Sequence, residues 1–133
     1  MLIVGAKGFA QEVLEILYQL DDIDNLVFYD DVNKNVTKKL YNKYNVLTTI
    51  NEAENYLKTV DNRFTLGIGN PILRKKLSDK FIKLGGQLTS TISKHAKIGQ
   101  HCVSISKGSN ILDQAVLSSD INVGLCAIIY YNS

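Results

Sequence analysis

The chain has 133 residues, of which 45% are hydrophobic and 21% charged, and its formal net charge is +2. This length suits one domain or two small ones. Basic residues are scattered and no apolar run approaches a membrane span, so we expect no nucleic-acid surface and no membrane association. No signal peptide precedes Leu2, which predicts a cytoplasmic protein. The two cysteines, Cys102 and Cys126, lack metal-ligand spacing, so we predict small wall residues and no metal site.

The first seventeen residues contain a strand, a glycine turn and a helix. Residues 2–4 form a short apolar run, and Gly5 and Gly8 bracket the turn that follows. One helical face is then given by Phe9, Val13, Ile16, Leu17 and Leu20. A helix N-terminus after a glycine turn presents backbone N–H groups to an anion, which favours a phosphate site. Because G-x-x-G is shorter than the dinucleotide fingerprint, a turn that only allows close helix–strand packing remains the alternative.

A second strand at residues 26–29 runs into Asp30 and Asp31. In nucleotide-binding α/β units, an acidic residue about 20 positions after the glycines binds a ribose hydroxyl. Asp30 lies 22 positions after Gly8, which fits this spacing. A solvated pair of aspartates opening a loop is the alternative, but together with the glycine turn we favour the ribose role.

The next segment carries weaker signals. Residues 33–45 have no clean period and are interpreted as a loop, followed by a short strand at Val46 and Leu47. Asn51 and Glu54 are spaced as a capping pair, which predicts a brief helix there.

A third strand at residues 64–68 again runs into a helix. It ends at Gly69, and Asn70 followed by Pro71 predicts a helix start. Gly85 and Gly86 end this helix. Its predicted buried stripe consists of Leu73, Leu77, Phe81 and Leu84. Since parallel strands place both glycine turns at one edge of the sheet, we expect the two turns to share a pocket.

Arg74 falls in the first turn of the third-strand helix, where the helix dipole disfavours a cation. A side chain that reaches for a phosphate would explain this placement. The alternative is an exposed basic residue among Lys75, Lys76 and Lys80.

From about Leu88 the pattern changes to intervals of six residues, with a single interval of seven. The recurring aliphatic residues are Ile92, Ile98, Ile105, Ile111, Leu117, Val123 and Ile129. Four positions after most of these stand Ala96, Cys102, Ser109, Ala115, Ile121 and Ala127. Hexapeptides with an aliphatic anchor predict a parallel β-helix, the alternative being an irregular β-rich segment.

These motifs occur in an order that resembles the bacterial hexapeptide-repeat sugar acetyltransferases, the group of sialic-acid O-acetyltransferases and UDP-amino-sugar N-acetyltransferases. The resemblance rests on the glycine turn, the Asp-Asp pair, the Ile-Gly-Asn-Pro-x-x-Arg block and the hexapeptides, and it covers essentially the whole chain. It implies an α/β fold with a small Rossmann-like, nucleotide-sugar-binding domain at residues 1–87. It further implies the first coils of a left-handed parallel β-helix at residues 88–133, a homo-oligomer (a trimer in the family) and acetyl-CoA as co-substrate.

The resemblance also implies a set of site residues. Those expected to line the nucleotide-sugar pocket are Gly5, Ala6, Lys7, Gly8 and Phe9. Asp30 and Asp31 would meet the sugar of the nucleotide. The base and phosphates would be bordered by Ile68, Gly69, Asn70 and Arg74. The chain departs from the family in having Lys7 where a glycine or serine is common and Phe9 where a histidine is frequent.

The family's general base is a histidine on a β-helix coil, which takes a proton from the sugar amine or hydroxyl as it attacks acetyl-CoA. Residues 128–133 resemble the strand before that histidine, and the sequence ends there. Neither His95 nor His101 matches the position, so we expect both at surface or coil corners and predict no catalytic residue. The sequence therefore predicts a C-terminally truncated acetyltransferase that is inactive alone. The alternatives are a non-catalytic nucleotide-sugar-binding module and, less favoured, an NAD-binding domain.

Overall fold

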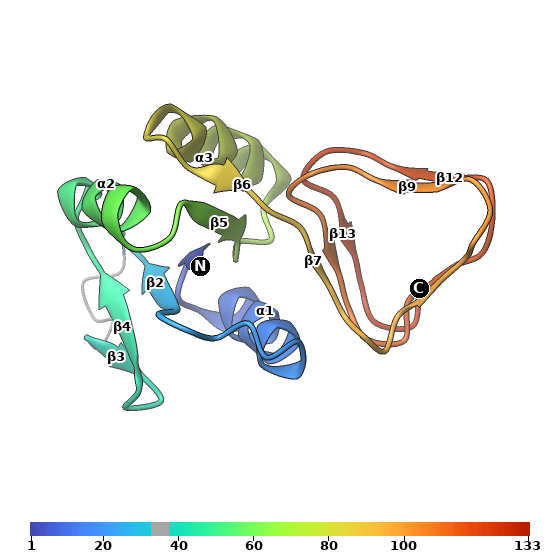
Figure 1. Cartoon of the computed structure of the whole chain (residues 1–133), viewed down its shortest axis with the longest axis horizontal. Coiled ribbons are helices and arrows are strands. Elements are labelled where there is room, and N and C mark those ends of the chain that lie inside the picture. Colours follow the sequence, from blue (N-terminus) through green and yellow to red (C-terminus); the bar gives the residue numbers. More distant parts are fainter. Residues whose placement is uncertain (33–37) are drawn as a thin grey trace.

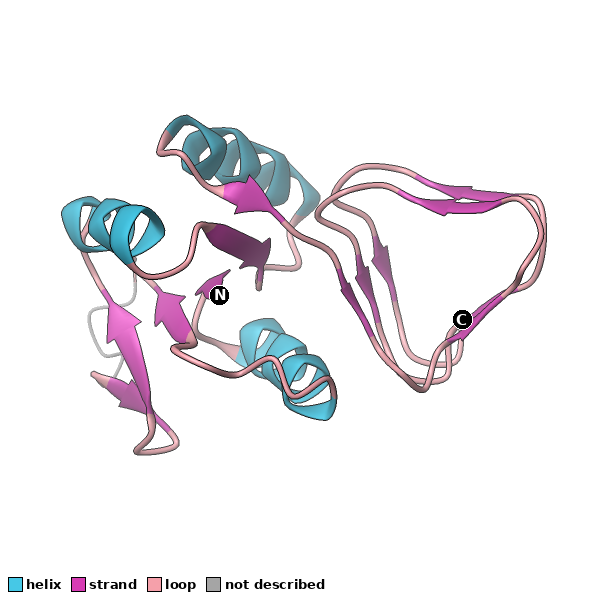
Figure 2. Cartoon of the chain, viewed as in Figure 1, coloured by secondary structure: helices cyan, strands magenta, loops and turns pink. Residues whose placement is uncertain are grey.

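The computed structural model describes residues 1–32 and 38–133, and it shows two parts side by side (Figure 1). One part is a sheet with three helices, and the other is a three-sided coil of strands (Figure 2). No helix among the described residues is long and apolar enough to cross a membrane.

The sheet has six strands in the order β3-β4-β2-β1-β5-β6. Neighbouring strands are parallel except β3 and β4, which are antiparallel. The strands are β1 (Leu2–Val4), β2 (Val27–Tyr29), β3 (Lys39–Leu40), β4 (Tyr44–Leu47), β5 (Arg63–Leu66) and β6 (Gln87–Leu88). The central strands β2, β1 and β5 run in the same direction, so their carboxyl ends meet at one edge. Of the predicted loop at residues 33–45, residues 33–37 lie outside the described residues, and β3 was not predicted.

Helices cover both faces of the sheet, as the alternation of side chains along β1 requires. Ile3 packs in a core with α1 (Gly8–Gln19), while Leu2 and Val4 pack in a second core on the opposite face. That second core contains residues of α2 (Ile50–Thr59) and α3 (Pro71–Lys83). Figure 1 shows α1 on one side of the sheet and the other two helices across it.

The helix starts agree with the sequence for α3 but not for α2. The Asn70 side chain accepts hydrogen bonds from the backbone N–H groups of Ile72 and Leu73, as an N-cap should. In α2 the N-cap is Thr49, whose hydroxyl donates to the Glu52 carboxylate and accepts from the Glu52 backbone N–H. The predicted pair of Asn51 and Glu54 is therefore wrong, because the cap forms two residues earlier, at Thr49 and Glu52.

The predicted buried stripe of α3 is confirmed at Phe81, Leu77 and Leu84, which pack in or against the second sheet core, but not at Leu73. Leu73 is 43% exposed, whereas Arg74, Ser78 and Phe81 are buried. The buried face extends to Arg74 because α3 packs against the coil as well as the sheet, and the guanidinium of Arg74 donates to carbonyls of the coil.

The coil consists of short strands that stack into three parallel sheets, β7-β10-β13, β8-β11 and β9-β12. Ile92, Ile111 and Ile129 stand in register with one another, and so do Ile98 and Leu117. The aliphatic residues thus stack along the interior of the coil. The strands are β7 (Thr91–Ile92), β8 (Lys97–Ile98), β9 (Val103–Ile105), β10 (Asn110–Ile111), β11 (Val116–Leu117), β12 (Ile121–Val123) and β13 (Ile128–Ile129).

The interval of seven residues adds one residue to the corner between β8 and β9. Val103 packs in the coil interior, and Cys102 is exposed with a positive φ of 56°. The prediction that Cys102 is a small wall residue is therefore wrong, because the extra residue shifts the inward position by one. Cys126 is half-buried beside the second sheet core.

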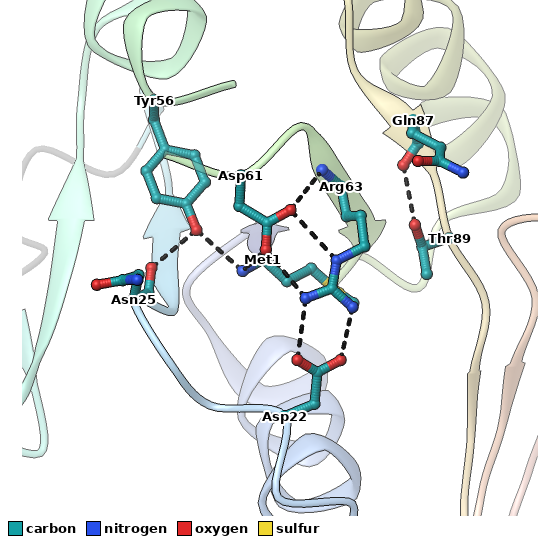
Figure 3. A network of polar contacts seen from close by, with 8 residues as sticks. All are labelled: Met1, Asp22, Asn25, Tyr56, Asp61, Arg63, Gln87 and Thr89. Carbon is teal, nitrogen blue, oxygen red and sulfur yellow. Dashed lines mark hydrogen bonds and ion pairs between the residues drawn. The ribbon is translucent and has the colours of Figure 1, made fainter. Parts of the chain in front are cut away.

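A charged network closes the edge of the sheet where β1 and β5 begin (Figure 3). Arg63 donates two hydrogen bonds to the Asp22 carboxylate and also binds Asp61, which accepts from the amino group of Met1. The hydrogen bond from Arg63 lowers the pKa of Asp22. Burial by itself would raise the pKa of Asp61, but the hydrogen bonds from Arg63 and the amino group hold that pKa well below its ordinary range.

This network predicts a pH dependence of stability. Because both carboxyl pKa values are lowered by folding, their stabilisation is complete above the unfolded value of about 4 and is lost as the pH falls below it. We expect Asp22→Asn to lower the free energy of unfolding at pH 7 by about 1 kcal/mol, because the Arg63–Asp22 pair is one-third exposed. The variant should also lose less of its free energy of unfolding than the wild type as the pH falls below about 4. Urea titrations at several pH values measure both. Glu54→Gln, which breaks the exposed pair with Lys58, is the control and should change neither.

The coil predicts a second effect on stability. A Cβ at Gly99 would lie 1.4 Å from the carbonyl oxygen of Ser118 in the next turn, whereas a Cβ at Gly124 would meet nothing within 4 Å. We expect Gly99→Ala to destabilise the chain by about 3 kcal/mol or more, because backbone must move, and Gly124→Ala to leave it nearly unchanged. Urea denaturation followed by circular dichroism compares them, and equal midpoints would contradict this stacking.

Candidate functional site

A cavity of about 500 Å³ opens at the edge where the carboxyl ends of β1, β2 and β5 meet. This is the edge at which open parallel sheets bind ligands. Residues that line the cavity are 4–7, Phe9, 29–32, 67–69, Leu73, Lys76, Leu77 and Lys80. Its walls therefore come from the turns after three strands and from one face of α3.

The turns after β1 and β5 are held together by two glycines. Gly5 has a φ of 117°, its N–H donates to the Tyr29 carbonyl, and a Cβ there would lie 2.6 Å from the Gly67 carbonyl oxygen. A Cβ at Gly67 would lie 2.6 Å from Cγ2 of Ile3. Close packing, the alternative interpretation of the first glycine turn, thus accounts for Gly5. A Cβ at Gly8 or Gly69 would instead meet nothing within 4 Å.

The N-terminus of α1 differs from those of the other two helices. Its N-cap is Lys7, which makes no side-chain cap, and its first turn contains no acidic residue. The corresponding N–H groups of α2 and α3 are capped by Thr49 and Asn70. Backbone donors without a side-chain acceptor, beside a cavity and at the positive end of the helix dipole, suit an anion.

Charges of both signs border the cavity at separate places. Lys76 and Lys80 stand one turn apart on α3, and Lys7 lies at the start of α1. Asp30 and Asp31 lie across from α3, at the end of β2. The cavity can therefore hold a ligand with an anionic group near the lysines and hydroxyl groups near the aspartates.

Local hydrogen bonds orient the two aspartates. Asp30 is 8% exposed and accepts from the backbone N–H of Val32 at 3.0 Å. The Tyr29 hydroxyl donates to Asp31 at 3.0 Å. Burial and this hydrogen bond raise the pKa of Tyr29 above its ordinary value.

The structure brings most of the predicted site residues together. Those that line the cavity are Gly5, Ala6, Lys7, Phe9, Asp30, Asp31, Ile68 and Gly69. Gly8 begins α1 next to the cavity without lining it, and Asn70 caps α3 with its side chain.

Arg74 is buried and does not line the cavity, so the prediction that it borders the phosphates is wrong. It is 2% exposed, and its guanidinium donates to the carbonyls of Ile68, Cys126 and Gly108 and to Oδ1 of Asn110. Burial lowers its pKa. With its donors engaged by coil and sheet, the side chain joins the two parts of the molecule and does not face the cavity.

Sequence reasoning missed the lysines and the leucines of the cavity wall. Leu73, Lys76, Leu77 and Lys80 follow the helical spacing i, i+3, i+4, i+7, so one face of α3 carries all four. A helical projection of α3 would have found this face beside the buried one. His95 and His101 are exposed on the coil and do not line the cavity, and the described residues contain no cluster suited to a metal ion.

The buried position of Arg74 predicts its effect on stability. Arg74→Met keeps much of the side-chain length but leaves the buried Asn110 amide oxygen and the coil carbonyls without their donor. We expect a loss of about 3 kcal/mol or more in the free energy of unfolding. Lys75→Met, at the exposed neighbouring position, is the control and should cost less than about 0.5 kcal/mol. Urea denaturation compares the two, and equal losses would contradict the junction role.

The comparisons with known proteins agree with this architecture. Residues 1–81 match the family model described as the PglD N-terminal domain. The fold is similar to that of a mutant perosamine N-acetyltransferase from Caulobacter crescentus solved with CoA and GDP-perosamine. The TM-score is 0.86 at 22% identity, covering 98% of this chain and 60% of that one. No curated protein matches the chain.

A second structure is also similar, the acetyltransferase domain of PglB from Neisseria gonorrhoeae. Its TM-score is 0.70 at 24% identity, covering 98% of this chain and 64% of that one. The same domain has been solved with acetyl coenzyme A, at a TM-score of 0.66 and 22% identity, with the same coverage of each chain. The chain thus spans about three fifths of the length of these structures, and the identities establish a shared fold.

Proposed function

The chain belongs to the family of PglD N-terminal domains, and from that membership and its cavity we propose that it binds a nucleotide sugar, the acetyl acceptor of a sugar acetyltransferase. The observation that carries the proposal is the cavity, which is bordered by the uncapped start of α1, by two lysines of α3 and by the two aspartates after β2. A diphosphate suits the helix start and the lysines, and a ribose suits the aspartates. The volume of about 500 Å³ lies within the range of small-molecule sites.

Each group of the ligand has a place in this arrangement. Phosphate oxygens would accept from the backbone N–H groups at the start of α1, with Lys7, Lys76 and Lys80 balancing their charge. Ribose hydroxyls would donate to Asp30 or Asp31. The apolar walls, which include Ile68 and Leu77, would pack against the base.

Acetyl-CoA is the co-substrate of the family, as the solved relatives crystallised with CoA or acetyl-CoA support. Neither described histidine lines the cavity of this chain. We therefore assign the residues of this chain to holding the acceptor and derive no acetyl-transfer step from them.

We also propose that residues 1–87 form the nucleotide-sugar domain and that residues 88–133 begin a left-handed β-helix through which copies assemble as trimers. The support is the stacking of the hexapeptides into three parallel sheets. The sheet β7-β10-β13 packs against the α/β part, while β8-β11 and β9-β12 present exposed side chains to which other copies could bind. Sedimentation equilibrium measures the assembly, and a monomer at all concentrations would contradict the trimer.

The lysines give a direct test of the proposed function. We expect the double variant Lys76→Met and Lys80→Met to weaken UDP or GDP binding by about tenfold and to reduce its dependence on salt, because two positive charges near the phosphates are lost. Isothermal titration calorimetry at two ionic strengths measures both. Lys83→Met, at the end of the same helix and outside the cavity, should leave the affinity unchanged.

One outcome would overturn the proposal, and another would overturn the role of the lysines in it. Binding of NAD alone, with no affinity for UDP-, GDP- or CMP-sugars, would favour an NAD-binding domain. Equal effects of the double variant and of the Lys83 control would remove the lysines from the site.

A further inference from the structure

An aromatic surface begins where the cavity ends. Phe9 lines the cavity, and its ring stacks on Tyr130 of the coil with centroids 6.3 Å apart and planes at 26°. Tyr131 stands at 88° to Tyr130, with centroids 5.2 Å apart. These three residues, Phe9, Tyr130 and Tyr131, form what we name the aromatic corner. The aromatic surface thus starts at a wall residue of the cavity, Phe9, and continues onto the coil, whose residues do not line the cavity.

The aromatic corner is open to a ligand and carries polar groups. Tyr130 and Tyr131 are 48% and 40% exposed, so a large part of each ring is accessible. The Tyr130 hydroxyl donates to Oε2 of Glu12 at 2.8 Å. Glu12 lies one turn after Phe9 on α1, so an acceptor and a hydroxyl stand beside the ring faces.

The direction of α1 relates this corner to the cavity. The helix begins at the uncapped end proposed to face the phosphates, and Phe9 and Glu12 follow along its length. The aspartates proposed to hold the ribose lie at the end of a different strand, β2. A group attached to the far phosphate, on the side away from the ribose, would therefore pass Phe9 and meet the corner.

A hexose ring has the chemistry that this corner recognises. Its apolar C–H faces pack on aromatic rings, and its hydroxyl or amino groups donate to a carboxylate or exchange hydrogen bonds with a phenol. A nucleoside diphosphate without a sugar would make none of these contacts.

We propose that the aromatic corner, together with Glu12, is the subsite for the hexose of the nucleotide sugar. This inference rests on the proposed function. It adds that the ring of Tyr130 and the carboxylate of Glu12 distinguish a nucleotide sugar from the free nucleotide. Phe9 separates the nucleotide part of the site from the sugar part.

The test compares each nucleotide with its sugar. Calorimetry with UDP, UDP-N-acetylglucosamine, GDP and GDP-mannose is carried out on the wild-type chain and on Tyr130→Ala. We expect Tyr130→Ala to weaken binding of a nucleotide sugar about tenfold and to leave the matching diphosphate within about twofold. Tyr130→Phe, which keeps the ring, should retain most of the affinity. Glu12→Gln should weaken only the sugar-bearing ligand.

Two control variants match these changes. Tyr41→Ala removes another exposed tyrosine, whose hydroxyl donates to the side chain of Gln11 on α1 and which is not part of the aromatic corner. Glu54→Gln changes an exposed carboxylate on α2, across the sheet from α1. Neither should change either affinity. Circular dichroism checks folding, and Tyr130→Leu replaces Tyr130→Ala if the latter unfolds.

The outcomes separate this inference from the proposed function. Suppose that diphosphates bind to the wild-type chain. If the Tyr130 and Glu12 variants then weaken binding of the diphosphate and of the nucleotide sugar equally, or change neither affinity, the sugar subsite is wrong and the nucleotide site stands. If wild type binds no nucleotide and no nucleotide sugar, the proposed function fails and the subsite fails with it.

Discussion

The guanidinium of Arg74 is buried between the sheet and the coil, and no carboxylate of the described residues pairs with it. Its hydrogen bonds go to backbone carbonyls at the end of β5 and on two turns of the coil, and to the amide of Asn110. Asn110 in turn donates to Thr91 and Thr65, which lie in the coil and the sheet. An unpaired buried charge is costly unless every donor is satisfied, so this arrangement fixes the coil against the sheet in one position.

That junction also bears on the candidate site. The Ile68 carbonyl that accepts from Arg74 belongs to the turn lining the cavity, and the guanidinium lies 5.9 Å from the centre of the Phe9 ring. The same side chain therefore holds the far end of the cavity wall and the coil that carries Tyr130. At the other end of α1, Gln19 donates to Asp113 of the coil, so the helix is bonded to the coil at a second point.

Charged side chains are arranged differently at the two ends of the parallel strands. Where β1 and β5 begin, oppositely charged groups neutralise one another around Arg63. Where the same strands end, the charges of the lysines and aspartates border an open cavity. Stability thus comes from paired charges at one edge, while the charges at the other edge are available to a ligand. This division follows from strand direction, since all the turns that present backbone donors lie at the carboxyl ends.

The sequence by itself determined the local features of this protein. The glycine turns, the Asn70 cap, the aspartates after β2 and the six-residue repeat each depend on neighbouring residues and on a fixed geometry of strand, turn or helix, so spacing was enough to find them. Tertiary structure alone decided where Arg74 points, which face of α3 lines the cavity, and that Phe9 meets Tyr130 from 121 positions further along the chain. These depend on packing between distant segments. An arginine that is buried at a junction and an arginine that binds a phosphate look the same in sequence, because either role needs only an arginine in the first turn of a helix.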